Sequence, residues 1–349
     1  MLFAHVILFG NVHRSTFLIR IRISIYRTCT VSGFAFSSVA FAIVKSNAVL
    51  EGQSALLVAF LLFCYQTCDG TDGKQARNTK SGSPIGEIVD HGVDALVTSW
   101  YAAVIMSVTS TTFSEEYGFW FLTLAQCAFV ASQLTLLHIG KQFIGQFDSQ
   151  EGQVFVQGLC LLSGFGLRSY LWDDVLGREL FTLGGHPWEG RDVILSAAIL
   201  QMGRSVLAYG YDIVSFYSSN KAIAKGKAAK KIESVRSFAY QATQLCIFVL
   251  LSRACYHRLE QWQWFFLSSF AIADLSNRVL VSRVVCVPTP WFTKCFGIMI
   301  LAAFVGNDIK NVSGWVWVAA MAASHTGYLI TRLRLFATAL EIRLFSIPH

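Results

Sequence analysis

Long apolar stretches alternate with short polar segments along almost the whole chain. A helix needs about 20 predominantly apolar residues to cross the hydrocarbon core of a bilayer. Windows of about 18 to 22 apolar residues give ten candidate spans, which begin near Val31, Ser54, Ile88, Glu116, Gln153, Asp192, Ser237, Trp264, Trp291 and Gly314. The span at Trp291 is short, and the span at Asp192 is interrupted by Arg204. The pattern predicts an all-α, polytopic integral membrane protein with about ten transmembrane helices.

Composition supports this class and argues against a soluble globular protein. Of the 349 residues, 54% are apolar and only 14% are charged, a balance typical of membrane proteins. The nine cysteines are scattered without the spacing of a metal site, and no internal repeat or interdomain linker interrupts the pattern. We therefore expect one membrane domain over residues 31–349, preceded by a cytosolic N-terminal segment of residues 1–30.

The basic residues predict an orientation. When the ten spans are threaded in order, the Asp69–Gly86 loop shares one side with the Lys-rich Ser218–Arg236 loop, the Arg-bearing N-terminus and the C-terminal tail. Most Lys and Arg residues then lie on that side, which the positive-inside rule assigns to the cytosol. The net charge of +7 is thus explained by topology, and no nucleic-acid partner is expected.

Acidic residues gather where the second and third spans meet this side. Asp69 and Asp72 end the second apolar stretch, and they lie one helical turn apart. On the third helix, four ionisable residues at i, i+3, i+4 and i+7 share one face: Glu87, Asp90, His91 and Asp94. Ionisable side chains at membrane depth are costly and usually mark function. The active site is therefore expected at the cytosolic end of helices 2 and 3.

These carboxylates favour a metal site. A single intramembrane aspartate can have a purely structural role, but several that converge without Lys or Arg partners repel one another by several kcal/mol at low dielectric. Bound divalent cations remove this repulsion, and an all-oxygen ligand set suits Mg²⁺ or Mn²⁺ better than zinc. We expect two such ions, with the ligands Asp69, Asp72, Asp90 and Asp94.

The neighbouring residues suit a phosphorylated substrate. Gly73 lets the backbone approach a diphosphate, Arg77 offers a planar cationic fork for phosphate oxygens, and Lys74 is a second cation. A hydroxyl acceptor needs a general base to take its proton. The candidates are His91 and Asp94, and Glu87, one turn before His91, is placed to orient the imidazole.

The whole block from Asp69 to Asp94 resembles the signature of the CDP-alcohol phosphotransferases, which are membrane enzymes. Eight positions of that signature are matched over 26 residues: Asp69, Asp72, Gly73, Ala76, Arg77, Gly86, Asp90 and Asp94. The Lys74-Gln75 and Asp90-His91-Gly92 segments resemble the choline- and ethanolamine-phosphotransferases of eukaryotes in particular. More loosely, Leu275-Ser276-Asn277-Arg278 is similar to a late-helix Thr-Asn-Lys motif of that subfamily.

The resemblance implies transfer of phosphoethanolamine or phosphocholine from CDP-ethanolamine or CDP-choline to diacylglycerol, with release of CMP. It implies the four aspartates as metal ligands, Gly73, Ala76 and Arg77 as nucleotide-binding positions, and His91 with Glu87 as the pair that deprotonates the acceptor. Elsewhere in the superfamily the fourth aspartate, here Asp94, has that role. The implied location is the endoplasmic reticulum or the Golgi, and the implied assembly is a homodimer.

The same residues are compatible with two alternatives. One is an inositol- or ceramide-directed member of the same superfamily. Another is a metal-binding transporter or scaffold without catalysis, which leaves Gly73, Ala76 and Arg77 without an evident use. The N-terminus departs from the relatives, which carry a longer leader ending in a Pro-Asn-x-x-Thr-like element. Here Tyr26-Arg27-Thr28-Cys29-Thr30 stands in its place, so the segment is a divergent start, a truncated sequence or a real loss of that element.

Overall fold

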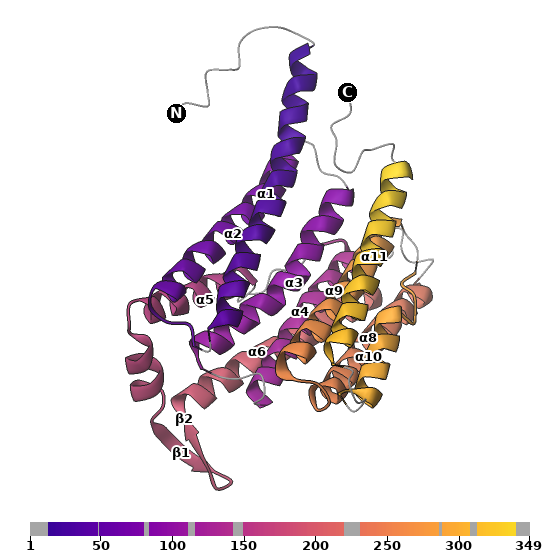
Figure 1. Ribbon diagram of the computed structural model, residues 1–349. Helices are drawn as coiled ribbons and strands as arrows, with labels where there is room; N and C mark the ends of the chain where they lie inside the picture. Colours follow the sequence, from indigo (N-terminus) through magenta and orange to yellow (C-terminus); the bar gives the residue numbers. More distant parts are fainter. Residues whose placement is uncertain are drawn as a thin grey trace.

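Long helices make up nearly all of the part of the chain that the structure describes (Figure 1). The computed structural model describes residues 13–47, 49–79, 84–110, 116–141, 149–219, 231–285, 288–307 and 313–339. Its α-helices are α1 (His13–Ser46), α2 (Gly52–Thr79), α3 (Pro84–Val108), α4 (Glu116–Ile139), α5 (Ser149–Gly164), α6 (Gly190–Ser218), α8 (Lys231–Tyr256), α9 (Gln261–Val285), α10 (Lys294–Val305) and α11 (Trp315–Ala339). A π-helical segment, Ser169–Val175, follows α5. The predicted all-α, polytopic class is confirmed.

The number of membrane spans differs from the number that the sequence predicts. Each of the ten predicted spans overlaps a helix, but within the described residues six helices are long and apolar enough to cross a membrane. A seventh span results if α5 and the π-helical segment, bent by 96° relative to each other, are counted together. The predicted count of ten is therefore not confirmed. With 12 residues α10 is short for a span, and the acidic residues of α3 lower its hydropathy.

The first helix crosses the boundary that we expected at residue 30. α1 runs without a break from His13 to Ser46, and its most apolar part is Cys29–Ser46. It packs against both α2 and α3. An aromatic stack joins these elements to α9, because the Phe41 ring lies between the rings of Trp100 and Phe265 at centroid distances of 5.3 and 5.5 Å.

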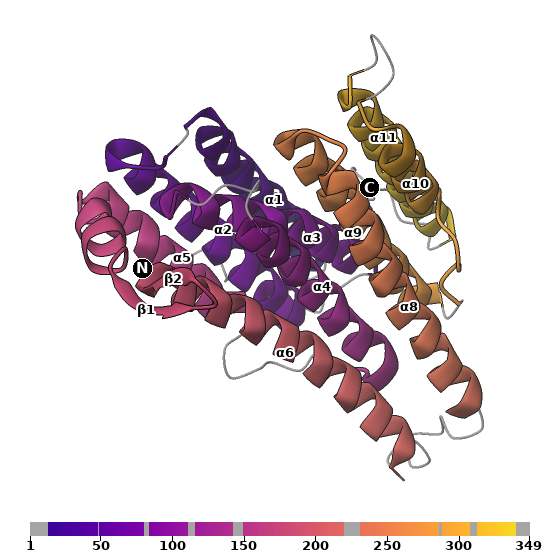
Figure 2. The ribbon, with the colours of Figure 1, turned by 90° about the horizontal axis from the view of Figure 1, so that it is seen from below.

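The remaining helices extend the bundle around α3, α4 and α9, which contact one another. Figure 2 shows α6 along one side of the bundle and α10 with α11 on another. In Figure 1 the N-terminal end of α1 and the C-terminal end of α11 point to the same end of the molecule.

A small β-hairpin at the opposite end of the bundle was not predicted (Figure 1). Strands β1 (Glu179–Leu183) and β2 (His186–Glu189) pair antiparallel. The turn uses Gly184 and Gly185 with φ of 62° and 79°, a conformation that favours glycine in two-residue hairpin loops. α6 follows at once, and Glu189 and Asp192 form a capping box at its first turn. Two strands this short lack the longer alternating pattern that identifies a strand from sequence.

Candidate active site

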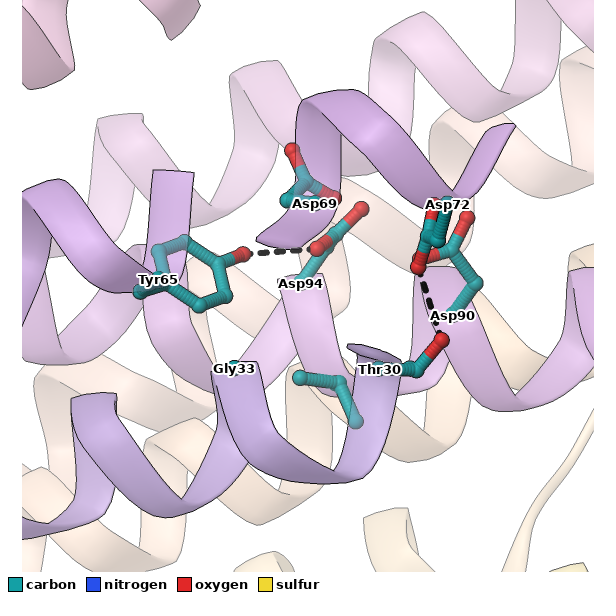
Figure 3. A pocket seen from close by; sticks show the side chains of 8 residues that line it. Thr30, Gly33, Tyr65, Asp69, Asp72, Asp90 and Asp94 are labelled. Atoms are coloured by element: carbon teal, nitrogen blue, oxygen red, sulfur yellow. Dashed lines mark hydrogen bonds between the residues drawn. The ribbon is translucent and has the colours of Figure 1, made fainter. Parts of the chain in front are cut away.

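Close packing of α1 against α2 shapes the candidate site. Gly33 of α1 faces the end of α2, and a Cβ atom at this position would lie 3.2 Å from Cβ of Cys68. The absence of a side chain therefore lets the two helices approach closely. A pocket opens beside this contact, lined by Thr30, Gly33, Tyr65, Asp69, Asp72, Asp90, Val93 and Asp94 (Figure 3).

The four predicted aspartates all line this pocket. Asp69 and Asp72 come from the last turns of α2, and Asp90 and Asp94 from the first half of α3. One carboxylate oxygen from each of Asp69, Asp72 and Asp90 lies within 4.8 Å of the other two. Asp94 shares the pocket but is not in this closest group. Its assignment as a metal ligand stays a prediction.

The donor set fits a hard divalent cation. Asp72 is 1% exposed, and its Oδ1 atom has no hydrogen-bond partner among the described residues. An unpartnered carboxylate oxygen beside two further carboxylates is strongly unfavourable without a positive charge. Three converging oxygens are ligands that Mg²⁺ and Mn²⁺ accept. The residues present therefore fit the metal that their chemistry implies.

Two hydroxyl groups orient the acidic side chains, and neither was among the predicted site residues. Thr30 Oγ1 donates a hydrogen bond of 2.7 Å to Oδ2 of Asp72, and the Tyr65 hydroxyl donates one of 2.7 Å to Oδ1 of Asp94 (Figure 3). Both donors are buried. The one sequence signal for Thr30 is the resemblance described above, in which an element ending in threonine is expected before the first span.

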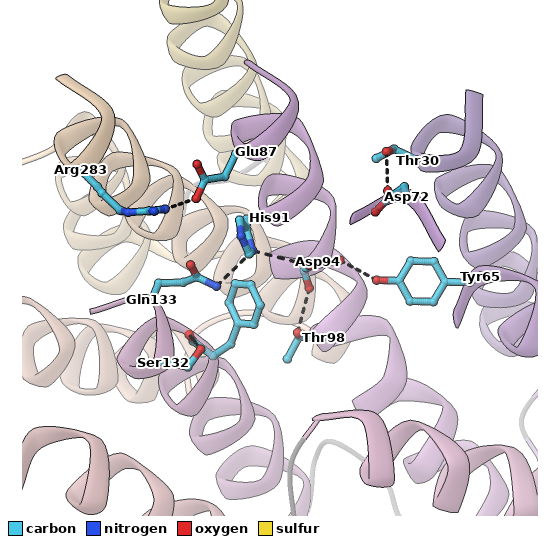
Figure 4. A network of polar contacts seen from close by, with 11 residues as sticks. Thr30, Tyr65, Asp72, Glu87, His91, Asp94, Thr98, Ser132, Gln133 and Arg283 are labelled. Atoms are coloured by element: carbon cyan, nitrogen blue, oxygen red, sulfur yellow. Dashed lines mark hydrogen bonds and ion pairs between the residues drawn. The ribbon is translucent and has the colours of Figure 1, made fainter. Parts of the chain in front are cut away.

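The candidate base His91 lies on the side of α3 that faces α4 (Figure 4). Its Nδ1 atom is 3.3 Å from Nε2 of Gln133 on α4 and 3.8 Å from Oδ2 of Asp94. Glu87, expected to orient the imidazole, forms an ion pair with Arg283 of α9. Contacts from Gln133 and Arg283 were not foreseen, because both residues are far from His91 in sequence. The roles predicted for His91 and Glu87 remain predictions.

The predicted nucleotide-binding residues follow the acidic pocket at the end of α2. Gly73 is half-buried and Lys74 is exposed. Ala76 and Arg77 belong to the last turns of α2, but their side chains lie outside the described residues. The part that is described places Gly73 directly after Asp72 in α2.

The Leu275–Arg278 segment of α9, which loosely resembles a subfamily motif, contacts α3. The buried amide of Asn277 lies against Gly92 of α3, where an added Cβ would be 2.9 Å from the amide oxygen. Neither polar atom of this amide has a hydrogen-bond partner among the described residues. Next to it, Arg278 forms an ion pair of 2.6 Å with Asp274. Gly92 therefore permits close packing of α3 on α9 immediately beside His91.

Comparison with known proteins identifies the region that contains this site. Residues 23–161 match the family model for CDP-alcohol phosphatidyltransferases. A Dictyostelium discoideum protein named "Uncharacterized CDP-alcohol phosphatidyltransferase class-I family protein 2" is 24% identical over 312 residues, which is 84% of this chain and 68% of that protein.

Two further relatives match shorter regions. Choline/ethanolaminephosphotransferase 1 of Arabidopsis thaliana is 48% identical over 69 residues, 20% of this chain and 17% of the plant protein. CDP-diacylglycerol–serine O-phosphatidyltransferase of Encephalitozoon cuniculi is 37% identical over 126 residues, 35% of this chain and 30% of that enzyme. The alignments with these two thus span less than a third of the relatives' lengths.

Fold and site together define a polytopic membrane protein with a carboxylate-lined pocket at the junction of two helices. The family match contains α2, α3 and all four pocket aspartates. Residues 23–161 are therefore similar to the CDP-alcohol phosphatidyltransferase family, and this matched segment contains the whole acidic cluster.

Proposed function

We propose that this protein transfers phosphoethanolamine, phosphocholine or both from the CDP-alcohol to diacylglycerol, giving phosphatidylethanolamine or phosphatidylcholine and CMP. The observation that carries the proposal is the convergence of Asp69, Asp72 and Asp90 within 4.8 Å. These residues belong to the signature, and the family match covers them. The subfamily is supported by the relative named choline/ethanolaminephosphotransferase 1.

The chemistry is a displacement at the β-phosphorus of the donor. The acceptor hydroxyl oxygen forms a bond to that phosphorus, and the bond from the phosphorus to the bridging oxygen breaks. CMP leaves with the bonding electron pair, and the hydroxyl proton passes to a base. Two bound Mg²⁺ or Mn²⁺ ions would neutralise the diphosphate charge.

Different residues would bind the metal ions, bind the nucleotide and accept the proton. Asp69, Asp72 and Asp90, joined by Asp94, would hold the metal ions. Gly73, Lys74, Ala76 and Arg77 would bind the nucleotide diphosphate by backbone approach and charge. His91 is our preferred base, with Asp94 as the alternative, because Asp94 lines the pocket and His91 Nδ1 lies 3.8 Å from Oδ2 of Asp94.

The bilayer supplies the acceptor in this proposal. Diacylglycerol would enter between the helices from the membrane, while the CDP-alcohol would reach the pocket from the cytosol. We place the protein in the endoplasmic reticulum or Golgi membrane, as a homodimer. Most Lys and Arg residues are predicted on the same side as the α2–α3 junction, which supports a cytosolic position of the pocket.

The test is an assay in membranes that lack these transferase activities. Labelled CDP-choline and CDP-ethanolamine are supplied with diacylglycerol, with and without Mg²⁺ or Mn²⁺, and lipid product and CMP are measured. Metal-dependent product from one or both donors is expected. Metal binding without CMP release would instead support the transporter or scaffold alternative.

A second candidate is favoured by a specific finding, the 37% identity to an enzyme named CDP-diacylglycerol–serine O-phosphatidyltransferase. That name describes the opposite partition of groups, in which the lipid is on the CDP donor and the acceptor is soluble. One further arm of the assay supplies CDP-diacylglycerol with serine or inositol, and another supplies ceramide as acceptor. Product only in one of these arms would replace the proposed substrates.

A further inference from the structure

Gln133 connects α4 to the candidate base on α3 (Figure 4). Its side chain is buried, with a residue exposure of 2%. The Nε2 atom lies 3.3 Å from Nδ1 of His91, while Oε1 of the same amide has no hydrogen-bond partner among the described residues. A buried oxygen left unpartnered costs about 1–3 kcal/mol. The amide can turn either its amino group or this oxygen towards Nδ1, so the protonation of the imidazole decides which of the two is paired.

The position of the imidazole proton decides which nitrogen of His91 can act as a base. A neutral imidazole carries a proton on one ring nitrogen and a lone pair on the other. Oδ2 of Asp94 lies 3.8 Å from Nδ1, and a carboxylate favours an N–H group over a lone pair on the nitrogen that faces it. Nδ1 is then the protonated nitrogen, and Nε2 keeps the lone pair.

If Nδ1 of His91 carries the proton, the atom of Gln133 that faces it must be a hydrogen-bond acceptor. Half a turn about the last side-chain bond exchanges the oxygen and the amino group of an amide with almost no change in shape. We propose that Gln133 accepts a hydrogen bond from Nδ1–H of His91 through Oε1, so that Nε2 stays free to take the acceptor hydroxyl's proton. Gln133 is thus a positioning residue, and this inference rests on the proposed function.

The same face of α4 offers a matched control. Gln126 lies two turns before Gln133, is 1% exposed, and also has an Oε1 atom without a hydrogen-bond partner among the described residues. Its Nε2 donates a hydrogen bond of 2.9 Å to Ser99 on α3. A substitution of Gln126 therefore removes the same group from the same helix interface without touching His91.

The experiment compares Gln133→Met, Gln133→Glu and Gln126→Met in the transferase assay, with Mn²⁺ binding and thermal melting as readouts of the intact site. Loss of a residue that orients a reactive ligand or base costs about 10- to 100-fold, so Gln133→Met should lower kcat by that factor. KM for both substrates should stay within about twofold, because only transition-state stabilisation is lost. Gln133→Glu, which keeps an acceptor, should have a higher kcat than Gln133→Met. Gln126→Met should keep the wild-type kcat.

A double variant gives the sharper test. If Gln133 acts through His91, adding Gln133→Met to His91→Ala should cause no further loss of kcat, since coupled residues are not additive. Multiplicative losses, equal losses in Gln126→Met, or a wild-type kcat in Gln133→Met would each overturn the inference while leaving the proposed function intact. A wild-type protein without product from either CDP-alcohol would overturn the proposed function, and the inference with it.

Discussion

Asp72 is a buried carboxylate close to other carboxylates, a position that is unfavourable without a cation but suits metal binding. It is 1% exposed, accepts a hydrogen bond from Thr30, and lies beside two further carboxylates. Asp72→Asn keeps the shape but removes a charged ligand. Metal ions supply several kcal/mol to such reactions, and each 1.36 kcal/mol is tenfold in rate, so we expect at least about a 100-fold loss of kcat.

The same substitution should not harm the metal-free fold, because it removes one charge from a cluster of like charges. The thermal midpoint without metal should equal or exceed that of the wild type, while the stabilisation by added Mn²⁺ should shrink. Asp174→Asn is the control, since Asp174 is exposed in the π-helical segment away from the pocket. Near-normal transfer by Asp72→Asn would contradict the metal assignment.

Thr30 tests whether α1 contributes chemistry or only packing. Thr30→Val retains the shape and removes the hydroxyl that donates to Oδ2 of Asp72. Partners of metal-binding side chains typically contribute 10- to 100-fold to metal affinity, so the Mn²⁺ concentration at half-maximal activity should rise by about tenfold. Thr30→Ser, which keeps the hydroxyl, should stay close to wild type. An unchanged Mn²⁺ titration in Thr30→Val would assign Thr30 a packing role.

Whether a site residue could be predicted depends on whether its contacts come from its own helix or from a distant one. The aspartates were predictable because the spacing within each helix decides which side chains share a face. Thr30, Gln133 and Arg283 reach the site from three other helices. Their contacts depend on how whole helices pack, and a single sequence carries little information on that. The ion pair of Glu87 with Arg283 is the clearest example, since the helix spacing had pointed Glu87 towards His91.

At the scale of elements, Gly92 controls how closely α3 and α9 pack. A Cβ atom at this position would be 2.9 Å from Oδ1 of Asn277. Alanine favours a helix over glycine by about 1 kcal/mol, whereas overpacking a buried contact costs about 1–3 kcal/mol. We expect the clash to dominate, so that Gly92→Ala lowers the thermal midpoint of the detergent-solubilised protein and reduces transfer.

The control for this prediction uses a glycine with free space. An added Cβ at Gly158, in α5, has nothing within 4 Å. Gly158→Ala should therefore keep or raise the midpoint through helix propensity alone. Combining Gly92→Ala with Asn277→Ala removes the clashing amide and should restore part of the loss. If Gly92→Ala behaves like Gly158→Ala, the close contact between α3 and α9 has no energetic importance.

Hydrophobic pattern predicts where helices lie better than which of them span a bilayer. Each predicted span overlaps a helix, yet α10 has only 12 residues. The bend of 96° after α5 likewise turns one apolar stretch into two elements. This bend occurs near Gly166, whose φ is 78°. A window average over the sequence does not register such a break, nor the two glycines that turn the β1–β2 hairpin.

At the scale of the whole molecule, the bundle has two distinguishable ends (Figure 1). The hairpin β1–β2 projects from one end, and the C-terminal end of α11 points to the other. The acidic pocket is built from the C-terminal turns of α2 and the N-terminal part of α3. Because the basic loops predict that the α2–α3 junction is cytosolic, the hairpin should lie in the lumen and the C-terminal tail in the cytosol.

Glycosylation reports this orientation directly. An acceptor sequence on a flexible linker, inserted between Gly184 and Gly185, should be glycosylated in microsomes, since the hairpin tip is a turn that tolerates insertion. The same sequence fused after His349 should remain unmodified. Both proteins should retain transfer activity, which shows that the tags leave the fold intact. Glycosylation of the tail with an unmodified hairpin would place the acidic pocket on the lumenal side, where a cytosolic CDP-alcohol could not reach it.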